Sequence, residues 1–212
     1  MTRRLPVYLL LDTSGSMRGE PIEAVNTGLQ TMISALRTDP YALETVCISI
    51  ITFDAMAEVV VPLTQLDELR VPTIETPQSG PTHMGLALET LSRNITQEIR
   101  YSTGSNKGDW APLLFIMTDG KPSDTLLFEE QCPKVKSIGF ANIVGCVAGP
   151  KADSTDLKKL CDQVVSLDTM DNSSFLDFFK WVSLLISRGN KSVGSNSSVS
   201  LPPPPPQIKL VL

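Results

Sequence analysis

The stretch VYLLLDTSGSM, residues 7–17, joins an unbroken apolar run to a turn built from Asp, Thr, Ser and Gly. An apolar run of this length, closed by a Ser/Gly turn, is typical of a strand that is buried on both faces of a parallel sheet. In open α/β sheets, ligands collect at the carboxyl ends of the strands. We therefore expect this turn to lie at a ligand-binding edge of the sheet.

The turn carries hard oxygen donors at alternate positions, Asp12, Ser14 and Ser16. Carboxylate and hydroxyl oxygens suit Mg²⁺, Mn²⁺ or Ca²⁺, whereas a softer metal prefers thiolate or imidazole ligands. The same residue types also favour turns and cap the amino ends of helices. Taken alone, the turn is therefore compatible with a metal site and with a purely structural role.

Two further segments favour the metal site. The stretch WAPLLFIMTDGKP, residues 110–122, repeats the design, with a buried strand followed by Asp119 and an abrupt Gly/Pro turn. Between them, QSGPTHMGLAL, residues 78–88, is a loop that runs into an amphipathic helix and places the Thr82 hydroxyl within reach of the same site. The three segments together supply five candidate metal-binding residues: Asp12, Ser14, Ser16, Thr82 and Asp119.

With these segments in this order, the chain resembles the von Willebrand factor A (VWA) family over residues 5–187. The metal-ion-dependent adhesion site (MIDAS) of that family consists of Asp-x-Ser-x-Ser, a Thr and a later Asp. Residues 53–57, FDAMA, are similar to a turn that family members carry after an early strand. The resemblance implies a domain that captures ligands through its cation without turnover.

Within the family, the chain is similar to the bacterial tellurium-resistance TerY group. This narrower resemblance is carried by residues 9–17 and by Ile22, Asn26, Gly28 and Leu29. It implies a role in a bacterial stress response to tellurite, in association with a protein kinase and a protein phosphatase.

The rest of the chain alternates between strand and helix patterns, which is typical of a doubly wound α/β fold. We expect a mostly parallel central sheet with helices on both faces and one antiparallel edge strand. Strands are predicted over residues 7–11, 45–53, 57–62, 141–147 and 163–167, with 57–62 as the antiparallel edge, and a further buried strand is predicted in the stretch from residue 110 to Asp119. Helices are predicted over residues 20–38, 83–100, 126–138, 154–161 and 173–187.

We predict one VWA domain over residues 1–188 and a separate tail over residues 189–212. The tail begins with Gly, Ser, Asn and Lys, continues with Pro202–Pro206, and ends in the apolar residues 208–212. Such a composition is typical of a solvated segment. A stiff polyproline stretch followed by apolar residues is also compatible with docking on the domain or on a partner.

Composition narrows the function further. The chain has 18 Lys and Arg against 23 Asp and Glu, a net charge of −5, and no basic stripe, which argues against nucleic-acid binding. The apolar run after Arg4 is short and ends at Asp12, so it does not fit a signal peptide and we expect a cytoplasmic protein that is not bound to a membrane. The four cysteines form no Cys-x-x-Cys pair, which favours free buried thiols.

Five protein oxygens leave a six-coordinate cation one position for an outside ligand, and a partner's Asp or Glu carboxylate suits it. We therefore expect a protein-binding module rather than an enzyme, with Mg²⁺ as the cation and Mn²⁺ or Ca²⁺ as alternatives. The rim of this site is predicted to be formed by Thr13, Gly15, Asp54, His83 and Gly120.

Two alternatives remain open at this point. A scaffold could recognise partners through its helical face and tail, with a metal that only stabilises the fold. A Mg²⁺-dependent phosphoryl-transfer enzyme could use a cation between acidic turns. The chain lacks motifs expected of such an enzyme, since it has no Gly-x-x-x-x-Gly-Lys-Ser/Thr loop and no second Asp two residues after Asp12.

Overall fold

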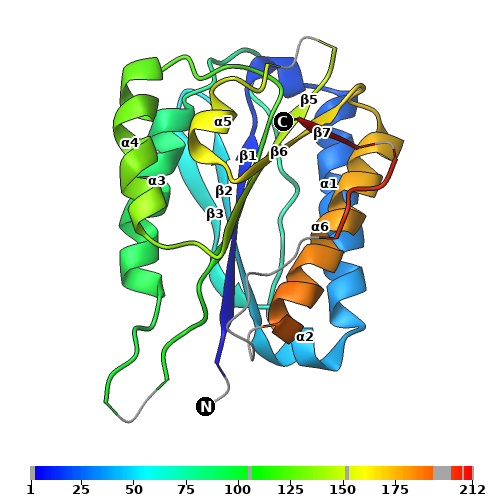
Figure 1. Cartoon of the computed structure of the whole chain (residues 1–212). Helices are drawn as coiled ribbons and strands as arrows, with labels where there is room; N and C mark the ends of the chain where they lie inside the picture. Colours follow the sequence, from blue (N-terminus) through cyan, green and yellow to red (C-terminus); the bar gives the residue numbers. More distant parts are fainter. Residues whose placement is uncertain (1–2, 105–106, 151–152, 193–201, 207, 212) are drawn as a thin grey trace.

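The protein folds around a seven-stranded sheet with the strand order β3-β2-β1-β4-β5-β6-β7, covered by helices on both faces (Figure 1). The structure is a computed structural model that describes residues 3–104, 107–150, 153–192, 202–206 and 208–211. The strands are β1 (Leu5–Asp12), β2 (Val46–Phe53), β3 (Ala57–Gln65), β4 (Leu113–Thr118), β5 (Asn142–Ala148), β6 (Gln163–Leu167) and β7 (Lys209–Val211).

Strand β1 lies inside the parallel part of the sheet. It pairs with β2 on one side and β4 on the other, so that Leu9 lies opposite both Ile50 and Phe115. Every residue of these three strands is buried. The prediction of a doubly wound, mostly parallel sheet is confirmed, and the turns after β1 and β4 lie side by side.

Antiparallel strands lie at both edges of the sheet. At one edge β3 pairs with β2, with Ala57 opposite Phe53, as the sequence predicts. At the other edge β7 pairs with β6, with Leu210 opposite Val165, which the sequence analysis did not include. This second antiparallel strand comes from the tail.

The described part of the tail packs against the domain. Pro202 and Ile208 are buried, and the indole Nε1 of Trp181 donates a hydrogen bond to the carbonyl oxygen of Pro202 at 3.1 Å. Of the two possibilities open from the sequence, docking therefore holds for residues 202–206 and 208–211. Residues 193–201, 207 and 212 lie outside the described residues.

The helices mostly follow the predicted pattern. They are the 3-10 helix η1 (Gly15–Met17), α1 (Glu20–Arg37), α2 (Pro40–Thr45), α3 (Met84–Glu98), α4 (Thr125–Ser137), α5 (Leu157–Leu160) and α6 (Asn172–Ser192). Helix α2 was not predicted, although Asp39 accepts a hydrogen bond from the Tyr41 backbone N–H at 3.0 Å and Pro40 occupies the first turn. Helix α5 is shorter than the predicted span 154–161.

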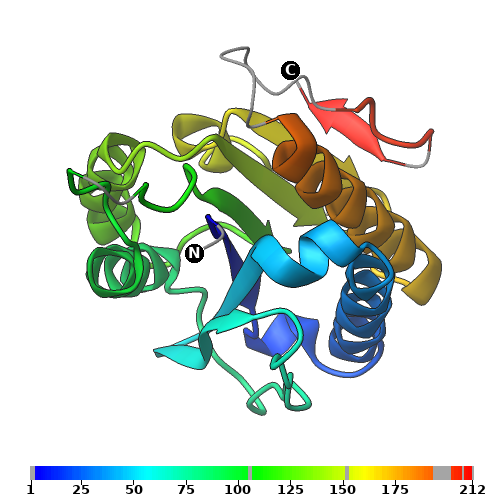
Figure 2. The ribbon, with the colours of Figure 1, turned by 90° about the horizontal axis from the view of Figure 1, so that it is seen from below.

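The alternation of side chains along β1 divides the core into two layers. Helices α1 and α6 cover one face of the sheet, and α3 and α4 cover the other (Figure 2). Leu9 and its neighbours two residues away pack toward α1 and α6, whereas Tyr8 and Leu10 pack toward α3 and α4. Helices α1 and α6 approach closely, since a Cβ atom added at Gly28 would lie 2.2 Å from the Phe179 ring.

The four cysteines are free thiols, of which Cys47, Cys132 and Cys146 are buried and Cys161 is half-buried. This agrees with the prediction of free thiols. Over the described residues, no helix combines the length and the apolar character needed to cross a membrane.

Candidate metal centre at the carboxyl edge of the sheet

Asp12 is the last residue of β1, and its side chain is only 1% exposed. One carboxylate oxygen, Oδ1, accepts a hydrogen bond from the Ser14 backbone N–H at 2.8 Å. The other, Oδ2, accepts one from the Thr118 hydroxyl at 2.5 Å. Because Thr118 ends the neighbouring strand β4, the carboxylate is held between the ends of two parallel strands.

The turn after β1 presents two hydroxyl groups next to this carboxylate. The Ser14 and Ser16 Oγ atoms lie 3.2 Å apart, and Met17 N–H closes the turn on the Ser14 carbonyl at 2.9 Å. Gly15 packs against the loop before α3, since a Cβ atom placed there would lie 3.0 Å from the Ser79 Cα atom. The Gly15 backbone N–H also donates to the Gly80 carbonyl at 3.3 Å.

Thr82 lies in that same loop and is fixed from the other side by the segment after β4. Its backbone N–H donates to the Ser123 hydroxyl at 3.1 Å, and the Ser123 N–H donates to the Thr82 carbonyl at 2.8 Å. A Cβ atom added at Gly120 would lie 3.7 Å from the Thr82 hydroxyl oxygen. The Thr82 hydroxyl thus borders the turn that carries Asp119.

Asp124 holds α3 and α4 together at this edge. Its carboxylate accepts hydrogen bonds from the backbone N–H groups of Gly85 at 3.0 Å and Leu86 at 2.8 Å, in the first turn of α3. A carboxylate at this position satisfies donors that a helix amino end leaves free. The bond fixes the start of α3 directly after Thr82.

Asp119 is the member of the set whose hydrogen bonding is incomplete. Its Oδ1 atom is buried and has no hydrogen-bond partner among the described residues. Asp119 also acts on Asp12: burial, with a smaller repulsion from Asp119, raises the pKa of Asp12 to about 6 against the opposing hydrogen bonds from Ser14 and Thr118. A buried, unpaired carboxylate oxygen beside a second buried carboxylate is costly unless a cation compensates it.

The structure therefore brings the five candidate residues together from three separate segments. Two carboxylates and three hydroxyls form a set of hard oxygen donors, which fits a divalent cation of the Mg²⁺, Mn²⁺ or Ca²⁺ type. The described residues contain no cluster of three or more His, Cys, Asp or Glu side chains that could hold a metal. The candidate set is of a different kind, because three of its five side chains are hydroxyls.

Hydrogen bonds support the turn after β1 through three of the predicted rim residues, Thr13, Asp54 and His83. The Thr13 hydroxyl donates to the Phe53 carbonyl at 3.2 Å or to the Asp54 carboxylate at 3.1 Å. The His83 N–H donates to the Asp54 carbonyl at 2.9 Å, and the His83 ring Nδ1 lies 3.1 Å from the Ala55 carbonyl oxygen. This network joins the ends of β1 and β2 to the start of α3.

Three residues at this edge were missed by the sequence analysis: Thr118, Ser123 and Asp124. Thr118 orients Asp12, and Ser123 and Asp124 position Thr82 and α3. A signal was present for each, since Thr118 directly precedes Asp119 and a Ser-Asp pair after Pro122 is typical of a helix start. The hydrogen-bond partners of these side chains depend on long-range packing, so a local sequence pattern does not identify them.

A family model described as the von Willebrand factor type A domain matches residues 7–179 of the chain. No curated protein matches it. Among solved structures, the pilus adhesin SpaC from Lactobacillus rhamnosus GG, in an open conformation, superposes with a TM-score of 0.69 at 12% identity, covering 89% of this chain and 30% of that one.

A von Willebrand factor type A structure from Catenulispora acidiphila has a TM-score of 0.64 at 16% identity and covers 88% and 43% of the two chains. Proximal thread matrix protein 1 from the mussel byssus, with a zinc-occupied MIDAS motif, has a TM-score of 0.64 at 15% identity and covers 87% and 48%. The chain thus spans less than half the length of these proteins, and the likeness concerns the fold.

Proposed function

Since the chain belongs to the von Willebrand factor type A family, whose domains generally mediate protein–protein interactions, we propose that it is a metal-dependent protein-binding module. The proposed cation ligands are Asp12, Ser14, Ser16, Thr82 and Asp119. The observation that carries the proposal is the buried Oδ1 atom of Asp119, which has no partner among the described residues and lies near the buried carboxylate of Asp12.

The chain's own residues prepare this site in distinct ways. Thr118 and the Ser14 N–H each hold one oxygen of Asp12, which fixes the plane of the carboxylate. The Ser14 and Ser16 hydroxyls bond to each other, so their remaining lone pairs are available to a cation. When bound, a divalent cation would supply a position that accepts a carboxylate oxygen from an acidic residue of a partner.

We propose Mg²⁺ as the cation, with Mn²⁺ and Ca²⁺ as alternatives, because all five ligands are oxygens. The zinc-occupied MIDAS of the mussel byssus protein is a reason to include Zn²⁺ in the comparison. Calorimetric titration of the four metals into the protein would rank them.

We propose that the site binds without catalysing a reaction. Two side chains near it that could move a proton or hold an anion are engaged elsewhere. The His83 ring faces the Ala55 carbonyl oxygen, and Lys121 pairs with Asp153 at 2.9 Å. The His83 ring and the Lys121 ammonium are thus engaged by other groups of the protein and not by the proposed cation site.

The proposed setting is the bacterial cytoplasm, in a TerY-like stress-response system for tellurite that is linked to a protein kinase and a protein phosphatase. Its support is the similarity of residues 9–17 to the TerY group. A host strain that lacks the gene should grow poorly on tellurite, and wild type should restore growth whereas Asp12→Ala should not. Equal growth of all three strains would contradict this setting.

The deciding experiment is affinity capture of partners from native lysate with the wild type, the wild type plus chelator, and a folded Asp12→Ala variant. Asp153→Asn is the matched control, because it removes a half-buried carboxylate close to Lys121 outside the proposed ligand set. Partners should be lost with chelator and with Asp12→Ala, and kept by the control.

The same experiment separates the module from a scaffold with a structural metal. Ser14→Ala should weaken capture and leave the fold intact if the metal contacts the partner. If the metal only supports the fold, this variant should unfold at a lower temperature and still capture its partners.

A further inference from the structure

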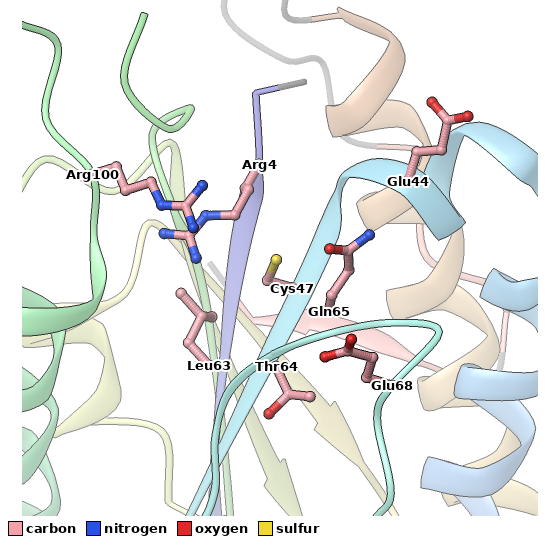
Figure 3. Close-up of a pocket in the computed structure, with 8 residues that line it drawn as sticks. All are labelled: Arg4, Glu44, Cys47, Leu63, Thr64, Gln65, Glu68 and Arg100. Carbon is pink, nitrogen blue, oxygen red and sulfur yellow. The ribbon is translucent and has the colours of Figure 1, made fainter. Parts of the chain in front are cut away.

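A pocket lies at the end of the sheet opposite the candidate metal centre, where β1 and β2 begin and β3 ends (Figure 3). It has a volume of about 460 Å³, within the range of about 300–1,000 Å³ typical of small-molecule sites. Strand β1 has eight residues and so separates this pocket from the candidate metal centre by about 26 Å. The pocket is therefore a separate feature from the proposed cation site.

One wall of the pocket carries two guanidinium groups, those of Arg4 and Arg100 (Figure 3). Arg4 is held by the buried carboxylate of Asp109, through contacts of 3.0 Å from Nε and 2.6 Å from Nη2, and it also donates to the Glu98 carbonyl at 2.8 Å. The Asp109 oxygen that accepts from Arg4 Nη2, Oδ2, also accepts a hydrogen bond from the backbone N–H of Arg100 at 2.9 Å. Asp109 thus fixes both residues.

Only one of the two arginines of this wall, Arg4, forms an ion pair among the described residues. Asp109 is one carboxylate, and it forms its ion pair with Arg4. The guanidinium of Arg100 has no hydrogen bond or ion pair to any residue that the structure describes. Two neighbouring planar guanidinium groups, of which one has no ion pair among the described residues, offer N–H donors that suit a carboxylate.

The other wall carries the carboxylates of Glu44 and Glu68, of which Glu68 is directed toward the pocket in Figure 3. Neither carboxylate forms an ion pair within the described part of the chain. The groups between the walls are uncharged: the Gln65 amide and the thiol of Cys47, whose pKa is raised by burial. The pocket is therefore positive on one side, negative on the other and neutral in the middle.

We propose that this pocket binds a short free peptide as a zwitterion, with its terminal carboxylate against Arg100 and Arg4 and its terminal ammonium against Glu68. The amide of Gln65 can both donate to and accept from the peptide groups between the two ends. A simple anion would satisfy only the arginine wall, and a simple amine only the glutamate wall. A ligand with both charges satisfies the two walls at once.

The test is calorimetric titration of the full chain with oligoalanines of one to four residues, which carry the same end groups at increasing separation. At least one length should bind saturably, and its N-acetylated and C-amidated forms should each bind at least tenfold more weakly. Chelator should leave this binding unchanged, because the pocket lies far from the proposed cation ligands. Sodium acetate and methylamine serve as the single-charge probes and should bind at least tenfold more weakly.

Two variants test which wall of the pocket binds each end of the peptide. Arg100→Ala should lower the affinity at least tenfold and abolish the discrimination against the C-amidated peptide. Glu68→Gln should do the same for the N-acetylated peptide. Arg93→Ala, which removes an exposed arginine of α3 outside the pocket, is the matched control and should bind like the wild type.

Absence of saturable binding for all four lengths would overturn the proposal. So would equal binding of a capped peptide or of acetate, which would indicate an anion site, or an Arg100→Ala variant that binds like the wild type.

Discussion

The two ends of strand β1 differ in whether their buried charged groups have partners within the described structure. At its amino end, Arg4 meets Asp109 in an ion pair of 2.6 Å in which the two side chains are 16% and 2% exposed. At its carboxyl end, Asp12 is buried beside another carboxylate, and Asp119 Oδ1 has no partner in the described structure. At the amino end the buried charges are paired within the chain, and at the carboxyl end a buried carboxylate oxygen is left without a partner among the described residues.

This difference indicates which end depends on something from outside. A buried charge without a partner is tolerated only where the protein gains function or where a ligand compensates it. The amino end of β1 can be understood from stability alone, apart from Arg100. The carboxyl end cannot, so removing the Asp109 charge should destabilise the protein, whereas removing the Asp119 charge should stabilise the metal-free protein.

The largest expected effect is at the amino end. Asp109→Ala should lower the free energy of unfolding by about 3 kcal/mol, because it leaves the Arg4 guanidinium unpaired and the Arg100 N–H without its acceptor. Urea unfolding measures this value. Asp168→Ala breaks an ion pair with Lys209 whose side chains are 63% and 64% exposed, and it should cost less than about 1 kcal/mol. An equal loss of unfolding free energy in the two variants would contradict the idea that the buried ion pair matters more than the exposed one.

At the carboxyl end, a divalent cation should add stability that the metal-free protein lacks. Mg²⁺ at about a hundred times its dissociation constant should raise the free energy of unfolding by about 2.7 kcal/mol. Thermal unfolding with Mg²⁺ and with chelator measures the difference, which Asp12→Ala should abolish and Asp109→Asn should retain. A wild type indifferent to every metal tested would remove the basis of the proposed function.

Thr118→Val should lower the stability of the metal-free protein by about 2 kcal/mol, because one oxygen of the buried Asp12 carboxylate loses its donor. Chemical unfolding in the presence of chelator measures it. Thr125→Val removes a hydroxyl that donates to the Pro122 carbonyl at 3.2 Å near the same edge, and this control should cost less. An unchanged Thr118→Val protein would show that Asp12 is not held through Thr118.

The smallest effect has the reverse sign. Asp119→Asn should raise the stability of the metal-free protein by about 1 kcal/mol, because it removes the repulsion between two carboxylates. The same variant should lose metal-dependent stabilisation. Paired unfolding curves with chelator and with Mg²⁺ measure both effects, and a destabilised metal-free variant would indicate that Asp119 serves the fold.

The sequence was sufficient to predict most of the fold because the strands that build it are locally distinct. Long apolar runs such as residues 46–53 end at clear turns, and parallel pairing follows from the helices between them. Helix α2 was missed because it has only six residues, too few for a helical period to be visible. Strand β7 was missed because its pairing with β6 has no local signal.

The candidate site was predictable in its ligands and unpredictable in its supports. Asp12, Ser14 and Ser16 lie at alternate positions of one turn, and Asp119 follows a strand of the same kind, so their convergence could be inferred from strand order. The bond from Thr118 to Asp12 joins residues 106 positions apart. Such partners depend on which hydroxyl the packed strands bring close, which local patterns do not reveal.

The docking of the tail has a consequence for the handling of the protein. Strand β7 occupies the backbone donors and acceptors on the outer side of β6, from Val164 to Ser166. A chain shortened before Pro202 would expose that row of groups on a strand rich in β-branched residues, which is a template for another molecule's strand. We therefore expect β7 to protect the outer side of β6 against aggregation, and the concentration up to which the shortened protein stays monomeric should fall.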